Sequence, residues 1–148
     1  MIEVTATIII TASSVLLFGY WFRYTCLLIL SAKTTRDYAA DIAAANQLCF
    51  LTVQAQLSSA IPQSLDGLSA ALNRDYATLR SMMERAAAGE DMIESRMLQI
   101  NYQMMRAWYG VSRQFSATSA RKALEEMSMV VAHFANSMGE RAAAASAA

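Results

Sequence analysis

The hydrophobic and polar positions divide the chain into one long apolar segment at its start and several helical segments after it. The apolar segment runs from Thr5 to Ala32 and contains one charged residue, Arg23. A lipid core of about 30 Å needs roughly 20 apolar residues in a helix, and a helix pairs its own backbone polar groups within the lipid. The pattern therefore predicts a single-pass transmembrane anchor over residues 1–32, followed by a separate domain.

A cleaved signal peptide is the first alternative for this segment. Such a peptide begins with a basic region and has a shorter apolar stretch, whereas the only charge before this run is acidic Glu3. A buried core helix fits this length and apolarity less well still. We therefore expect an anchor that remains part of the chain.

Cations and aromatic residues gather at the C-terminal end of the apolar segment. Lys and Arg mark the cytoplasmic side of a span, and the N-terminal flank has neither. The sequence thus predicts an outside N-terminus and a cytoplasmic domain at the inner (plasma) membrane. Arg23 is expected to extend toward the headgroups, the alternative being an intramembrane charge paired with a partner or cofactor. The expected membrane-interface residues are Tyr20, Trp21, Arg23, Tyr24, Lys33 and Arg36.

The domain is predicted over residues 33–139, beginning with a helix that continues from the anchor. Nothing between Lys33 and Ala60 stops a helix, although Thr34 or Thr35 with Asp37 offers an alternative start. Residues 42–65 carry no charge, which is typical of a buried helix. A second membrane span over Ala39–Ile61 is the alternative, opposed by the polar side chains of Asn46, Gln47, Gln54 and Gln56.

Three further helices are predicted from apolar residues spaced three and four apart. Pro62 marks a boundary, because proline suits the first turn of a helix and disfavours helix just before it. One helix is expected over 63–88, with Gly89 closing it. The next starts in the acidic residues 90–94, and the last is capped by Ser116 or Thr118 and ends at Gly139. The three expected core stripes are Leu65, Leu68, Leu72, Tyr76, Leu79, Met83 and Ala86; Ile93, Met97, Ile100, Met104, Trp108 and Val111, widened by Leu98, Met105 and Tyr109; and Ala120, Leu124, Met127, Val131, Phe134 and Met138.

These segments predict an all-α protein in which the domain is an antiparallel bundle of three to four helices. The spacing of the stripe over 63–88 is also that of a coiled-coil seam. The Ala-rich tail, residues 140–148, is expected to be disordered because it has nothing to pack on.

Composition narrows the classes of function. The chain has 12 basic and 12 acidic residues, so charge gives no reason to expect a nucleic-acid partner. The two cysteines, Cys26 and Cys49, do not form a disulfide framework and suit a reducing cytoplasm.

No catalytic, metal or cofactor motif is found, so we expect neither an enzyme nor a bound cofactor. A di-iron bundle needs two Glu-x-x-His pairs, and the one histidine, His133, has no glutamate three residues before it. The acidic residues are expected to cap helices or face solvent; they are Glu90, Asp91, Glu94, Glu125 and Glu126.

The helix that begins near residue 90 is the predicted interaction element. It is rich in methionine and aromatic residues, which fill cores but also form adaptable binding surfaces. The candidate partner face is Tyr102, Met105, Trp108, Tyr109 and Phe115.

The sequence therefore predicts a membrane-anchored structural or accessory protein, a non-catalytic subunit or scaffold. Its expected partners are the bilayer and other membrane-complex subunits or further copies of itself. The alternatives are a single-pass signalling or sensor module and a cofactor-carrying subunit of a bioenergetic complex.

Overall fold

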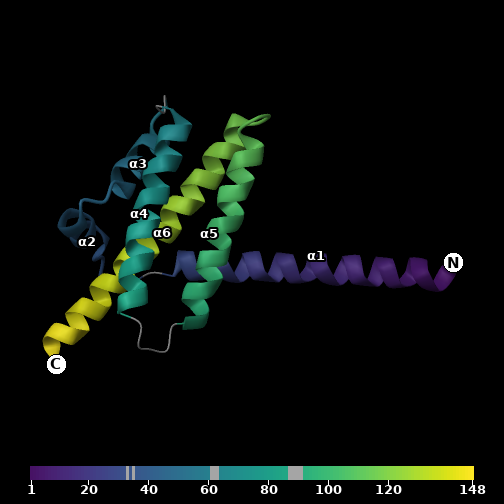
Figure 1. The fold of residues 1–148 in the computed structure, drawn as a ribbon, viewed down its shortest axis with the longest axis horizontal. Coiled ribbons are helices and arrows are strands. Elements are labelled where there is room, and N and C mark those ends of the chain that lie inside the picture. Colours follow the sequence, from purple (N-terminus) through teal and green to yellow (C-terminus); the bar gives the residue numbers. More distant parts are fainter. Residues whose placement is uncertain (33, 35, 61–63, 87–91) are drawn as a thin grey trace. The chain divides into compact units, whose positions relative to one another are not determined.

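In a computed structural model, the chain is all-α over the residues that the structure describes, which are 1–32, 34, 36–60, 64–86 and 92–148. This confirms the predicted all-α class. The chain forms two units, residues 1–32 and 33–148, and each is described by itself. The helices are α1 (Ile2–Ser31), α2 (Ala39–Asn46), α3 (Phe50–Ser58), α4 (Leu65–Arg85), α5 (Met92–Ser112) and α6 (Ala117–Ala147) (Figure 1).

The first unit consists of α1. Among the described residues, α1 is the one helix long and apolar enough to cross a membrane, judged by length and composition. Its hydroxyl groups need no outside partner, because several of them donate to the carbonyl oxygen four residues earlier. These are the hydroxyls of Thr5, Thr7, Ser14 and Thr25.

In the second unit, α6 is the central helix and packs against α2, α3, α4 and α5 (Figure 1). Most members of the stripes predicted for the 63–88 helix and for the last helix are buried in this core, which confirms their assignment. Leu65 and Met138 are only partly buried, and Ala86 is exposed. The buried members are Leu68, Leu72, Tyr76, Leu79 and Met83 of α4 and Ala120, Leu124, Met127, Val131 and Phe134 of α6.

The predicted continuous helix from Lys33 to Ala60 is wrong. The chain leaves the helical conformation at Ala32 and again at Gln47, whose left-handed backbone (φ 54°, ψ 42°) ends α2. The peptide N–H of Cys49 then donates to Oδ2 of Asp75 on α4, at 2.6 Å. A hydrogen bond to a side chain of α4 therefore replaces the backbone hydrogen bond that the Cys49 N–H would have donated within a continuous helix.

This break also removes the alternative of a second membrane span over Ala39–Ile61. The helices α2 and α3 have 8 and 9 residues, and at 1.5 Å per residue neither approaches the thickness of a lipid core.

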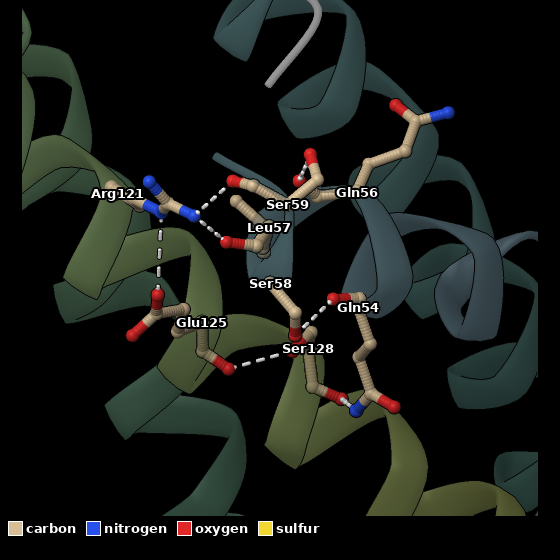
Figure 2. A network of polar contacts seen from close by, with 8 residues as sticks. All are labelled: Gln54, Gln56, Leu57, Ser58, Ser59, Arg121, Glu125 and Ser128. Carbon is tan, nitrogen blue, oxygen red and sulfur yellow. Dashed lines mark hydrogen bonds and ion pairs between the residues drawn. The ribbon is translucent and has the colours of Figure 1, made fainter. Parts of the chain in front are cut away.

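Figure 2 shows how α3 is fastened to α6. The guanidinium Nη2 of Arg121 donates to the carbonyl oxygens of Leu57 and Ser59, the second at 2.8 Å. These carbonyls lie at the C-terminal end of α3, where backbone acceptors lack partners within the helix and attract a cation. Nε of the same guanidinium lies 3.6 Å from Oε1 of Glu125 on α6. Arg121 thus holds the C-terminal end of α3 against α6.

The predicted helix stop at Gly139 is also wrong, because α6 continues to Ala147 and includes most of the tail that we expected to be disordered. Gly139 is buried in the helix, and a Cβ atom there would lie 2.1 Å from Cβ of Tyr38. Next to it, the peptide N–H of Tyr38 donates to Oδ1 of Asn136 at 2.7 Å. The glycine thus allows a close approach between the start of α2 and α6.

The predicted cap at Ser116 is confirmed, since its Oγ accepts a hydrogen bond from the Ser119 N–H at 3.2 Å. The predictions for Pro62, Gly89, Glu90 and Asp91 lie outside the described residues.

Candidate interaction site on helix α5

Helix α5 buries a different face from the one that its apolar stripe predicts. The residues it buries are Leu98, Asn101, Tyr102, Tyr109 and Ser112. The six residues of the predicted core stripe instead lie largely exposed, so that assignment is wrong. Of the residues expected to widen it, Leu98 and Tyr109 are buried and Met105 is partly buried. Over the residues that the structure describes, the second unit thus leaves a large apolar surface of α5 exposed.

Tyr102 is the centre of the buried face. Its ring stacks on Tyr76 of α4, with 3.8 Å between ring centroids and 3° between ring planes. Its hydroxyl donates to Oδ1 of Asn73 at 2.9 Å. Burial raises the pKa of Tyr102 far above its ordinary value, with the neighbouring Tyr76 adding to the effect. A buried ring with a paired hydroxyl is an anchor of the fold.

Tyr109 holds the other end of α5 to the start of α4. Its hydroxyl donates to Oδ1 of Asp66 at 2.6 Å, and Nη1 of Arg113 donates to the same oxygen at 2.7 Å. These two hydrogen bonds lower the pKa of Asp66, with Tyr109 as the larger cause. Burial, followed by the bond to Asp66, raises the pKa of Tyr109 to about 12.

Polar contacts also join α5 to α6 beside the exposed surface. Nδ2 of Asn101 donates to Oε1 of Glu126 at 2.8 Å. Oε1 of Glu94 lies 3.2 Å from Nε2 of His133. His133 of α6 thus faces the carboxylate of Glu94 on α5. The orientation of α5 is fixed on both sides, so its outward side is a defined surface.

We call this outward side the α5 outer face. It follows one line of the helix, with members spaced alternately three and four residues apart. Large apolar side chains on it are 40–76% exposed, and Met97 is partly exposed. The rings of Trp108 and Phe115 meet edge-on with 6.3 Å between centroids. Its members are Ile93, Met97, Ile100, Met104, Ala107, Trp108, Val111 and Phe115.

The predicted partner face is divided by this geometry. Trp108 and Phe115 belong to the outer face, whereas Tyr102 and Tyr109 lie inside and Met105 is partly buried. Sequence reasoning missed Ile93, Ile100, Met104 and Val111 as surface residues. Apolar residues occupy two faces of α5, and spacing alone gives no sign of which one faces the core.

The predicted membrane-interface residues are mostly found on α1. Tyr20, Trp21 and Tyr24 form a cluster of rings, each pair with centroids 5.9–6.3 Å apart, and all three side chains are exposed. Arg23 lies on the same helix. In the second unit, the guanidinium of Arg36 lies 5.4 Å from the ring centroid of Tyr38, and Lys33 is outside the described residues.

Over the described residues, no group of three or more His, Cys, Asp and Glu side chains is arranged to hold a metal ion. Cys26 and Cys49 are both reduced thiols, and Sγ of Cys49 accepts a hydrogen bond from Nη2 of Arg74 at 2.9 Å. The α5 outer face is therefore the candidate site that the geometry supports best.

Comparisons with protein-family models, with curated proteins and with solved structures give no match for this chain.

Proposed function

We propose that this chain is a membrane-anchored, non-catalytic accessory or scaffold protein that assembles with other proteins through the α5 outer face. In this proposal α1 crosses the inner membrane with its N-terminus outside, and residues 33–148 act as an antiparallel helical bundle in the cytoplasm. The observation that carries the proposal is a helix with one face buried in the second unit and a second face that is apolar and exposed.

The α5 outer face exposes more contiguous apolar surface than a helix without a partner needs to. Scattered apolar side chains on a surface are ordinary, but a contiguous patch of several hundred Å² is typical of an interaction site. The α5 outer face joins Ile93, Ile100, Met104, Trp108 and Val111 in one stripe, and each is at least 40% exposed. Leaving them in water is unfavourable by roughly 25 cal/mol per Å². A partner helix would remove that cost.

The anchor supports the same proposal. Since α1 is exposed along most of its apolar length, the bilayer is a suitable solvent for it. Lys and Arg near its C-terminal end favour a cytoplasmic second unit. Confinement to a membrane raises the effective concentration of anchored partners, so a modest helix contact is sufficient for assembly.

The experiment is extraction of the native membrane in mild detergent, pull-down through a C-terminal tag, and mass determination of the complex. The double variant Ile100→Gln/Met104→Gln makes the middle of the apolar stripe polar without burying a charge, and Gln retains helix propensity. Leu51→Gln is the matched control, because Leu51 is an exposed apolar residue on α3, 39% exposed. We expect the double variant to lose its stoichiometric partners and the control to retain them. Equal recovery of partners by both variants would refute the proposal.

A further inference from the structure

We propose that the occupant of the α5 outer face is the same face of a second copy of this chain, with the two α5 helices antiparallel. The inference rests on the proposed function, since it identifies the partner through which assembly begins.

The spacing of the exposed residues indicates a helix as the occupant. One line of residues along α5 advances by alternating steps of four and three positions. Its members, which form the seam, are Ile93, Met97, Ile100, Met104, Ala107 and Val111. This is the seam of a two-helix coiled coil, in which side chains of one helix enter the spaces of the other. The stripe has a polar edge formed by Arg96 and Gln103, together with Gln99 and Arg106, so its width suits a helix better than a bilayer surface.

The exposed area is about the least that a specific dimer needs. Six side chains of the face are 40–76% exposed. At roughly 150–250 Å² for a large aromatic side chain and less for an aliphatic one, they present on the order of 500 Å² of apolar surface. Complete burial of this surface in two copies would remove about 1,000 Å² from water, which is about the smallest area expected of a specific interface.

The order of side chains along α5 favours the antiparallel arrangement. Reversing one helix about the midpoint of the seam places Ile93 opposite Val111 and Met97 opposite Ala107 of the second copy. Ile100 then lies opposite Met104. Each methionine thus meets a smaller side chain, and Ile93 meets Val111 of similar size, as dense packing requires. A parallel pair would instead place Met97 against Met97 and Ala107 against Ala107, crowding one layer and leaving another under-filled.

The edge of the seam is compatible with this pairing. In the antiparallel register Gln103 lies beside Gln103 of the second copy, and an amide can both donate and accept. Arg96 lies beside Gly110 of the second copy, so no like charges are opposed. A hollow between α4 and α5, lined by Ile100, Met104 and Ala107 with Tyr76 and Arg80, lies along this edge. Met97 of the second copy would lie over it.

Cysteine cross-linking of the full chain in detergent tests the arrangement. Cys26 and Cys49 are replaced by Ser, and differently tagged chains carrying Ile93→Cys and Val111→Cys are co-expressed. Both positions are exposed, so a folded chain is expected, and a helical melting curve checks it. A disulfide requires Cβ atoms about 3.5–4.5 Å apart. We expect a disulfide between the two tagged chains.

The single variants provide the control for direction. In an antiparallel pair, two copies of Ile93→Cys lie about 27 Å apart at 1.5 Å per residue, so this variant alone should not cross-link. Efficient cross-linking of Ile93→Cys with itself would overturn the proposed direction. We also expect Ile100→Gln/Met104→Gln to dissociate at least tenfold more readily than the Leu51→Gln control, measured as the mass of the detergent-solubilised protein against concentration.

The outcomes separate the two proposals. A monomeric wild-type chain that still captures another subunit through the α5 outer face would overturn the second copy and support the accessory function. A wild-type dimer whose mass is unchanged by Ile100→Gln/Met104→Gln would overturn the α5 outer face as the dimer contact. If pull-down partners also persist in that variant, the proposed function fails as well.

Discussion

At the scale of single residues, two positions acquire their roles from neighbours that are distant in sequence. Gly139 has the sequence signature of a helix end, yet it lies inside α6 against Tyr38. Asp66 reads as a helix-start carboxylate, which favours the positive end of a helix, yet it also accepts hydrogen bonds from Tyr109 and Arg113.

Gly139→Ala should destabilise the second unit. Glycine to alanine in a helix ordinarily gains roughly 0.5–1 kcal/mol, but here the new Cβ would lie 2.1 Å from Cβ of Tyr38. Overpacking of this kind typically costs about 1–3 kcal/mol. Gly67→Ala is the control, because a Cβ atom there would lie at an ordinary contact distance, 3.9 Å, from Cβ of Ser64. Denaturant unfolding in detergent, followed by circular dichroism, measures both. An equal or larger stability in Gly139→Ala would contradict the close contact with Tyr38.

The pair Asp66 and Tyr109 should make stability depend on pH at both extremes. The pKa of Asp66 is lowered below 3.8, so its contribution is present above that pH and lost as pH falls through the folded value. The pKa of Tyr109 is raised from 10.0 to about 12, so its contribution is present below pH 10 and lost between about 10 and 12.

Tyr109→Phe should weaken the dependence of stability on pH at both the acidic and the alkaline end. It removes the hydroxyl that is the larger cause of the lowered Asp66 pKa. Melting temperature against pH measures the effect, and Tyr20→Phe on α1 serves as the control. A Tyr109→Phe profile that superimposes on the wild-type profile would show that the hydrogen bond has no energetic role.

At the scale of elements, α5 is apolar on two faces with different roles. The buried face packs on α6 and, through its tyrosines, on α4, while the outer face remains exposed. The core of the second unit is therefore complete without Ile93, Ile100 or Trp108, and substitutions on the two faces should separate folding from assembly.

Tyr102→Ser should unfold the second unit far more readily than Trp108→Ser. Tyr102 is fully buried and stacked on Tyr76, and truncating a buried aromatic ring typically costs about 3–5 kcal/mol. Trp108 is 45% exposed, so its loss should change the free energy of unfolding of the separated chain by less than about 1 kcal/mol. Denaturant unfolding of both variants in dilute detergent provides the comparison. Similar losses would mean that Trp108 belongs to the core.

At the scale of the whole molecule, the chain combines an apolar helix with a helical unit that has its own core. The proposed function needs both: the first places the protein in a membrane, and the second carries the apolar contact. Either unit alone would lack one of the two conditions for assembly.

A reporter fused after Ala148 should be active only as a cytoplasmic fusion, and the protein should stay with the membrane after alkaline carbonate washing. The reason is the excess of Lys and Arg after the apolar segment. The control moves positive charge to the N-terminal side, with Glu3→Lys and added lysines, and should weaken or invert the topology. A fusion active only outside the cytoplasm would contradict the proposed orientation.

The sequence by itself determined the helical class, the apolar first segment and most of the α4 and α6 core. Helix periodicity places Leu72, Leu79, Leu124 and Val131 on one side of each helix, and these helices have a single apolar side to bury. The Ser116 cap was equally predictable, because it depends on atoms within three residues.

The tertiary structure alone decided where α2 and α3 divide, that Gly139 is a packing position, and which face of α5 is buried. Each depends on a partner far away in the chain: Asp75 for Cys49, Tyr38 for Gly139, and Tyr76 for Tyr102. Local spacing contains no information about such partners. Where one helix has two apolar faces, only the packing of the other helices determines which face remains available for a partner.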